Sequence, residues 1–246
     1  MKVLFTLISI DIGDDFYLLA SKRLINELLE KTPYDVLVST NNDNYFSDII
    51  SDRCVVRNNI RENSILKYGT EFNYNLKHHA FLEIPEKYDY IIYIDGDIKL
   101  MKWDDETENF INGEMSNYDF FGDRLNAVLI DEVNRFIKNE PCLFSHKIKS
   151  YDIMERFGID DEIMMSKMPS EHILILKNDP EKIMKFQEKW EELNEYLQSK
   201  NGVGGSWGDG FEIGISSNYA GFNQYFNLSP YYWSSVLGFE FNGNKF

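Results

Sequence analysis

DYIIYIDGDIKL, residues 89–100, is the segment from which the predicted organisation of this chain follows. Its apolar run at 91–94 is rich in β-branched residues and leads directly into Asp95, Gly96 and Asp97. A short run of this kind predicts a strand that is buried on both faces. Because two carboxylates at the end of a buried strand need a positive partner, a divalent metal ion is the simplest ligand to expect there.

The spacing of the two carboxylates supports the same expectation. In an extended segment, residues i and i+2 share a face, so Asp95 and Asp97 should project the same way from the carboxyl end of the strand. Oxygen ligands suit Mg²⁺ and Mn²⁺, which proteins commonly hold with one or two carboxylates while substrate phosphates complete the shell. Gly96 lets the backbone turn and a ligand approach closely. The alternative is a polar turn after a core strand, which is how most D-G-D sequences behave.

The composition narrows the class of protein. The chain has 246 residues, which is long enough for one large α/β domain with a full core. Its 18 Phe, 15 Tyr and 4 Trp favour a packed fold over disorder. The formal charge of −16, without any basic run, argues against a nucleic-acid-binding surface, which depends on clustered Lys and Arg. Single nucleotides are still candidate ligands, because a metal ion can offset the charge of their phosphates.

The cysteines and the amino-terminal segment bear on the compartment. Cys54 and Cys142 are the only cysteines, and they lie far apart without a metal-binding spacing, as expected for free thiols in a reducing compartment. The apolar run 3–10 is too short to span a membrane, and Asp11 follows where a signal peptide needs small residues. We therefore expect a cytoplasmic protein without a transmembrane segment, whose chain opens with a strand.

The first 124 residues predict alternating strands and helices. A strand, helix, strand unit at the start favours a parallel sheet with a right-handed crossover. A further helix leads directly into the D-G-D strand, which places both carboxylates at the carboxyl edge of an open sheet, where ligands of such folds bind. The expected elements are a strand at 3–10, a helix from Asp14 or Asp15 to about Thr32, strands at 34–40 and 54–60, a helix at 73–83 and a short strand at 117–124.

The rest of the chain is less regular until residue 168. We expect a helix at 131–141 and an insertion over the sheet, followed by a strand at 170–179. Pro180 suits the first position of a long amphipathic helix that ends at Gly202. A glycine-rich loop at 201–214 is typical of a segment that closes on a substrate, and the segment 212–222 should begin a final helix.

In order and local pattern these elements resemble the nucleotide-sugar-dependent glycosyltransferases of the GT-A fold, especially their glycogenin-like and galactosyltransferase-like members. The resemblance covers residues 1–124 and 168–222 and is poor over 125–167. It implies one α/β, Rossmann-like domain over 1–246 with a mostly parallel sheet flanked by helices. It also implies that 1–124 bind the nucleotide sugar and that 125–246, with the insertion 125–167, bind the acceptor. The segments that carry it are DDFYLLASKRLI at 14–25, LKHHAFLEIPEKYDYIIYIDGDI at 76–98, DFFGDR at 119–124, SEHILILKNDPEKIMKFQEKW at 170–190 and WGDGFE at 207–212.

The resemblance also implies roles for residues on the donor side. Asp95 and Asp97 match the D-x-D acids that hold Mn²⁺ or Mg²⁺ on the sugar-nucleotide diphosphate, and one of them also reaches the ribose. Lys77 matches a basic residue that contacts the nucleotide or the sugar. The positions that match the base-binding segment are Ser9, Asp11 and Tyr17. Many retaining members have another metal-binding histidine near the carboxyl terminus, whereas the histidines of this chain all come earlier, so the remaining metal ligands stay open.

On the acceptor side, Asp209 and Glu212 match the acidic segment that faces the sugar, with Trp207 as a stacking surface. Such an acid is a general base in an inverting displacement or stabilises an oxocarbenium-like centre in a retaining one, and the segment WGDGFE does not decide between the two. The alternatives are a helix cap for Asp209, a solvated first-turn acid for Glu212 and a core position for Trp207.

The sequence therefore predicts a glycosyltransferase that moves a sugar from a nucleotide-diphosphate donor to a hydroxyl acceptor, assisted by a metal ion. A nucleotidyltransferase is one alternative, although it usually carries a glycine- and basic-rich loop after the first strand, where this chain has the acidic IDIGDD. The other alternative is a non-catalytic module that binds nucleotides or carbohydrates.

Overall fold

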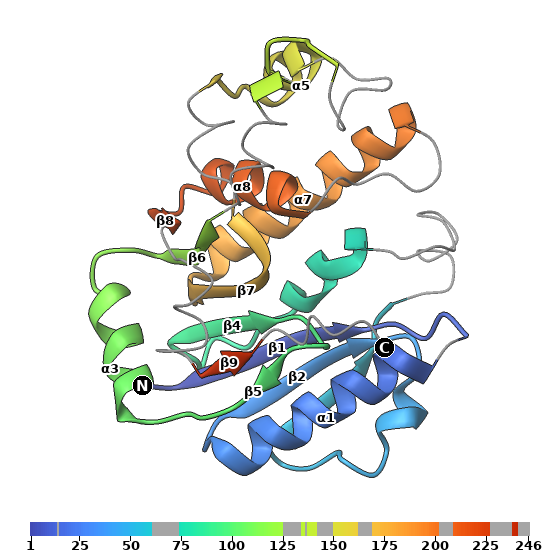
Figure 1. The fold of residues 1–246 in the computed structure, drawn as a ribbon, viewed down its shortest axis with the longest axis vertical. Coiled ribbons are helices and arrows are strands. Elements are labelled where there is room, and N and C mark those ends of the chain that lie inside the picture. Colours follow the sequence, from blue (N-terminus) through green and yellow to red (C-terminus); the bar gives the residue numbers. More distant parts are fainter. Residues whose placement is uncertain are drawn as a thin grey trace.

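The computed structural model describes residues 1–13, 15–60, 74–124, 134–135, 137–141, 150–161, 169–201, 209–226 and 238–240. In these residues a seven-stranded sheet of order β3-β2-β1-β4-β7-β6-β8 forms the centre, with helices on both faces (Figure 1). Only β7 runs against the other strands of this sheet in the described part of the chain. The predicted α/β class, with a mostly parallel sheet flanked by helices, is therefore confirmed.

The strands follow the predicted ones closely in the amino-terminal half, where apolar runs mark them. In the main sheet they are β1 (Val3–Ser9), β2 (Asp35–Thr40), β3 (Cys54–Asn58), β4 (Tyr90–Ile94), β6 (Phe120–Arg124), β7 (Pro169–Lys177) and β8 (Gln224–Phe226). A second, two-stranded sheet pairs β5 (Lys99–Leu100) with β9 (Phe239–Glu240).

The long helices begin where the sequence predicts them. The predicted final helix starts earlier than expected, at Asp209, because the end of the glycine-rich segment is already helical. None of the helices in the described ranges is both long and apolar enough to cross a membrane. The helices are α1 (Asp15–Lys31), η1 (Asp43–Phe46), η2 (Tyr74–Phe81), α3 (Asp105–Glu114), α5 (Ser150–Phe157), α7 (Pro180–Asn201) and α8 (Asp209–Tyr219).

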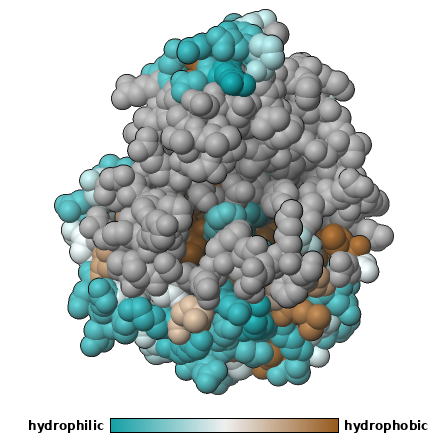
Figure 2. Space-filling view, in the orientation of Figure 1, coloured by the Kyte–Doolittle hydropathy of each residue, from teal (hydrophilic) through white to brown (hydrophobic). Residues whose placement is uncertain are grey.

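The core lies on both faces of β4, as its uninterrupted apolar run predicts. Ile92 and Ile94 pack in the cluster under α1, whereas Ile91 and Tyr93 pack in the cluster under η2 and α7, and all four are fully buried. Alternate residues of a strand point to opposite faces, so a strand covered on both sides must be apolar at every position. The space-filling view shows that the described surface outside this core is mainly hydrophilic on the side displayed (Figure 2).

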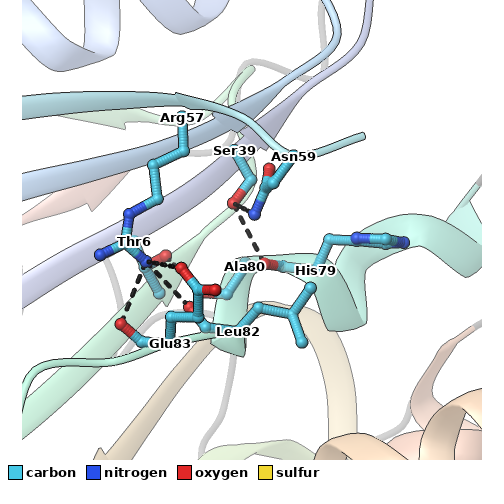
Figure 3. Close-up of polar contacts among 8 residues, drawn as sticks. All are labelled: Thr6, Ser39, Arg57, Asn59, His79, Ala80, Leu82 and Glu83. Atoms are coloured by element: carbon cyan, nitrogen blue, oxygen red, sulfur yellow. Dashed lines mark hydrogen bonds and ion pairs between the residues drawn. The ribbon is translucent and has the colours of Figure 1, made fainter. Parts of the chain in front are cut away.

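The helix predicted at 73–83 is a 3₁₀-helix, η2, whose carboxyl end is held by the sheet (Figure 3). The hydroxyl of Thr6 donates to the carbonyl of Ala80 at 2.6 Å, and the hydroxyl of Ser39 donates to that of His79 at 3.1 Å. Arg57 donates to the carbonyl of Glu83 at 3.0 Å. Because the last carbonyls of a helix have no partner within it, these side chains both satisfy them and fix η2 on the sheet.

Several predictions fall wholly or partly outside the described residues. Of the helix predicted at 131–141, residues 134–135 and 137–141 are described, and the amide of Lys138 donates to the carbonyl of Asn134 at 3.1 Å. Cys142, Gly202 and the glycine-rich residues up to 208 are among those not described. Cys54 is buried and free, as predicted.

Candidate active site

The D-G-D segment forms a tight turn immediately after β4. The amide of Ile98 donates to the carbonyl of Asp95 at 3.1 Å, which closes a four-residue turn. Asp95 and Asp97 therefore do not occupy alternate positions of an extended strand, so the predicted extended geometry of this segment was wrong. Burial raises the pKa of Asp97, and the nearby charge of Asp95 raises it further.

Asp95 is held by side chains from three elements. The ammonium of Lys77, on η2, lies 3.0 Å from Oδ1 and 3.1 Å from Oδ2 of Asp95. The hydroxyl of Tyr93, on β4, donates to Oδ1 at 2.6 Å, and Nδ1 of His172, on β7, lies 3.1 Å from Oδ2. The amide of Asp95 also donates to the carbonyl of His172 at 2.9 Å. Asp95 thus has a single, strongly determined position.

The charge of Asp95 is balanced by protein groups. Burial disfavours its ionised form, but Lys77 in the first place, followed by His172 and Tyr93, outweighs that cost and holds the pKa of Asp95 below its usual range. The positive partner that the sequence interpretation assigned to a metal ion is therefore supplied here by Lys77.

The donor set around the turn fits a divalent cation with Asp97 as its first ligand. A carboxylate offers about four acceptor positions, and those of Asp95 already meet Lys77, Tyr93 and His172. Within the described residues no side chain pairs with the carboxylate of Asp97, and no group of three or more His, Cys, Asp or Glu could enclose a metal by itself. A cation would thus take Asp97, share Asp95 and complete its shell with ligand phosphates, which is a usual arrangement for Mg²⁺.

The residues predicted to hold the nucleotide lie near the carboxyl ends of β1 and β2. Ser9 is buried, and its hydroxyl has no hydrogen-bond partner in the described part of the protein. Asp11 is fixed by Asn42, whose amide donates to its Oδ2 at 2.8 Å, and by Asn41, which exchanges hydrogen bonds with its backbone. Tyr17 lies in the first turn of α1, half-buried. The predicted binding of the base at this polar end of the sheet remains a prediction.

The residues predicted on the acceptor side are only partly described. Trp207 lies outside the described residues, and Asp209 is the first residue of α8. Glu212 lies in the first turn of α8 and is 1% exposed, so it is not a solvated first-turn acid. Their predicted roles toward the sugar and the acceptor remain predictions.

Tyr93 and His172 are site residues that sequence reasoning missed. In the sequence, Tyr93 is one residue of an apolar strand, and His172 precedes the carboxyl-terminal region where a metal-binding histidine is expected. The register of β4 with β7 pairs Ile94 with Ile173, so the next position brings His172 beside Asp95. That neighbourhood depends on the antiparallel direction of β7, which no spacing in the sequence reveals.

Comparison with known proteins gives similar chain paths but no sequence match. The sequence matches no protein-family model and no curated protein. The structure of mouse xyloside xylosyltransferase 1 in its apo form is 10% identical, with 99% of this chain and 98% of that chain covered and a TM-score of 0.45. The structure of the galactosyltransferase LgtC with donor and acceptor sugar analogs is 12% identical, with 96% and 78% covered and a TM-score of 0.45. Likenesses of this degree leave the activity to be argued from the site itself.

Proposed function

We propose that this protein is a glycosyltransferase that moves a sugar from a nucleotide-diphosphate donor to a hydroxyl acceptor with the help of Mn²⁺ or Mg²⁺. The observation that carries the proposal is the turn after β4. There, an ionised Asp95 that is held by three side chains lies two residues before Asp97, whose carboxylate pairs with no side chain of the described residues. This turn is at the carboxyl edge of the parallel strands, where open α/β sheets bind their ligands.

Each donor-side residue has a distinct task in this proposal. A cation held by Asp97 and Asp95 would act as a Lewis acid that stabilises the departing diphosphate. Lys77 holds Asp95 ionised in the free protein and adds a fixed positive charge beside the place where negative charge develops. Ser9, Asp11 and Tyr17 bind the nucleoside, and the hydroxyl of Ser9, which has no partner among the described residues, is one of the hydrogen-bonding groups.

The acceptor-side acids complete the proposed chemistry. Glu212 or Asp209 removes the proton of the acceptor hydroxyl if the displacement inverts the anomeric centre, or stabilises the oxocarbenium-like centre if it retains the configuration. The burial of Glu212 suits either task, since a carboxylate in a water-poor site interacts strongly with nearby charge. Trp207 provides the stacking surface for the sugar in the same proposal.

The direct test is a panel of nucleotide sugars, assayed for hydrolysis and transfer with and without Mn²⁺. We expect metal-dependent turnover with the wild type and its loss in Asp97→Ala. Asp48→Ala is the matched control, because Asp48 is an exposed aspartate whose partner is Lys22 on the surface. Full activity of Asp97→Ala would remove the site assignment.

One observation favours a second candidate, a module that binds nucleotides or carbohydrates without turnover. Lys77 already neutralises Asp95, so the site is electrostatically complete without a metal ion on that side. Calorimetry with a nucleoside diphosphate and Mn²⁺, run beside the turnover assay, separates the two functions. Binding without product after long incubation would favour the module.

A further inference from the structure

The segment that follows Asp95 is held along its backbone by one face of α1. Arg23 donates from Nη2 to the carbonyls of Asp97 and Ile98, both at 3.2 Å. The amide of Leu100 donates to Oε2 of Glu27 at 2.9 Å, and Lys31 donates to the carbonyl of Leu100 at 2.5 Å. These three side chains are spaced four residues apart, so they form one row along the helix. The row thus binds backbone groups of residues 97–100, in addition to the pairing of β5 with β9.

Helix α1 also packs closely against the Asp95–Ile98 turn at Gly96. A Cβ atom built on Gly96 would lie 2.2 Å from the hydroxyl oxygen of Ser21 and 3.3 Å from its Cβ. Ser21 is itself buried, on the turn of α1 that precedes Arg23. The turn is thus pressed against α1 at Gly96 and bonded to it at Asp97.

Arg23 has the geometry needed to fix the turn rather than merely to cover it. Its guanidinium is planar, and one nitrogen bridges two consecutive carbonyls, which restrains the Asp97–Ile98 and Ile98–Lys99 peptide planes on either side of the Cα atom of Ile98. Glu27, 3.8 Å from Nε of Arg23, adds a charge partner on the same helix face. Asp95 is fixed through its side chain. Asp97 is fixed through its backbone, because Arg23 donates a hydrogen bond to its carbonyl.

We propose that Arg23 is a positioning residue that sets the geometry of the Asp95–Asp97 turn and so directs the carboxylate of Asp97 toward the ligand site. In its catalytic consequence this inference rests on the proposed function. The geometric part concerns the turn alone and can be measured without any substrate.

The experiment compares Arg23→Met, which keeps an apolar stem without donors, with Arg23→Lys, which restores one cationic donor. Arg53→Met is the matched control, because Arg53 also donates to two carbonyls of the α1 region, those of Leu29 and Thr32, but at the other end of the helix. The first readout is amide hydrogen exchange of Ile98, whose bond to Asp95 closes the turn. The second is kcat and KM for the nucleotide sugar that the wild type uses.

In Arg23→Met we expect exchange at Ile98 to become about tenfold faster, since a hydrogen bond from a charged donor is lost. We expect kcat to fall about tenfold or more with KM within about twofold, because a small displacement of a reacting group is costly. Arg23→Lys should recover most of both effects, and Arg53→Met should show neither.

Unchanged exchange at Ile98 in Arg23→Met would overturn the proposal, as would an equal loss of kcat in Arg53→Met. If the wild type turns over no nucleotide sugar, the proposed function fails by itself. The exchange of Ile98 then decides the positioning role alone, with faster exchange supporting it and unchanged exchange overturning it.

Discussion

The ammonium of Lys77 lies 3.0 Å from Oδ1 of Asp95, and the two side chains are 6% and 14% exposed. The pair joins η2 to the end of β4. In the sequence these two elements are separated by residues 82–89. Buried ion pairs of this kind are sensitive to the loss of one member, because the other is left charged and without a counter-ion.

Replacing Lys77 by Met should destabilise the fold by about 3–5 kcal/mol, the range for breaking a buried pair by removing one partner. The check is denaturant unfolding of Lys77→Met beside Lys87→Met. Lys87 pairs with Asp35 at 3.3 Å but is 62% exposed, so its replacement should have little effect on the free energy of unfolding. Similar, small losses in both variants would contradict the structural role given to Lys77.

Replacement by Asn should lower the stability of the fold at Asp95 but not at Asp97. The lowered pKa of Asp95 means that its charge stabilises the fold above its usual titration range, and that this stability is lost as the pH falls through the lowered pKa. The raised pKa of Asp97, caused by burial and by Asp95, means that its charge opposes folding at neutral pH. Unfolding at pH 7 should therefore show that Asp95→Asn loses stability and that Asp97→Asn loses none, while both lose metal-dependent turnover. A stable Asp95→Asn with a destabilised Asp97→Asn would reverse the assignment.

Gly96→Ala should destabilise the protein by about 1–3 kcal/mol, the usual cost of overpacking, because the added methyl meets Ser21. Removing the Ser21 hydroxyl in the double variant Gly96→Ala/Ser21→Ala should recover part of the loss. Gly113→Ala is the control, since no atom of the described residues lies within 4 Å of a Cβ at that helical glycine, and it should stabilise α3 by about 0.5–1 kcal/mol. Thermal unfolding of the variants measures these differences. An unaffected Gly96→Ala would mean that the turn does not pack tightly on α1.

His79 should make the fold sensitive to mild acid. Burial lowers its pKa from 6.5 to about 4, and its Nδ1 has no partner in the described residues. Since the folded pKa is depressed, the stability is complete above pH 6.5 and declines as the pH falls toward 4, by up to about 3 kcal/mol. The measurement is the difference in unfolding free energy between the wild type and His79→Phe across this range. A difference that does not change with pH would show that His79 is not buried in the neutral form.

The sequence suffices to predict the elements whose local pattern is unambiguous. The apolar run 91–94 predicts a strand covered on both faces, and Pro180 with its following apolar stripe predicts α7, because burial and helix initiation are local properties. The partners of Asp95 are not local. His172 reaches it only because β7 runs antiparallel to β4, and these two strands lie far apart in the sequence.

The geometry of the D-G-D turn is the other part that sequence reasoning did not predict. Arg23 looks like an ordinary surface arginine of an amphipathic helix, since its acceptors are backbone carbonyls that any residue carries. Hydrogen bonds to backbone carbonyls do not depend on the type of the accepting residue, so the sequence does not reveal them. Gly96 is the exception, because its missing side chain is the condition for the close approach of Ser21.

The position of β7 has a consequence for how the chain is made. β4 is synthesised long before β7, yet β7 is the strand that pairs with its free edge and lies between it and β6. On the ribosome, the nascent chain therefore carries an open strand edge beside Ile91 and Tyr93 until residue 177 has emerged. Such an edge invites pairing with other chains, so production of this protein should benefit from chaperones that shield the unfinished sheet.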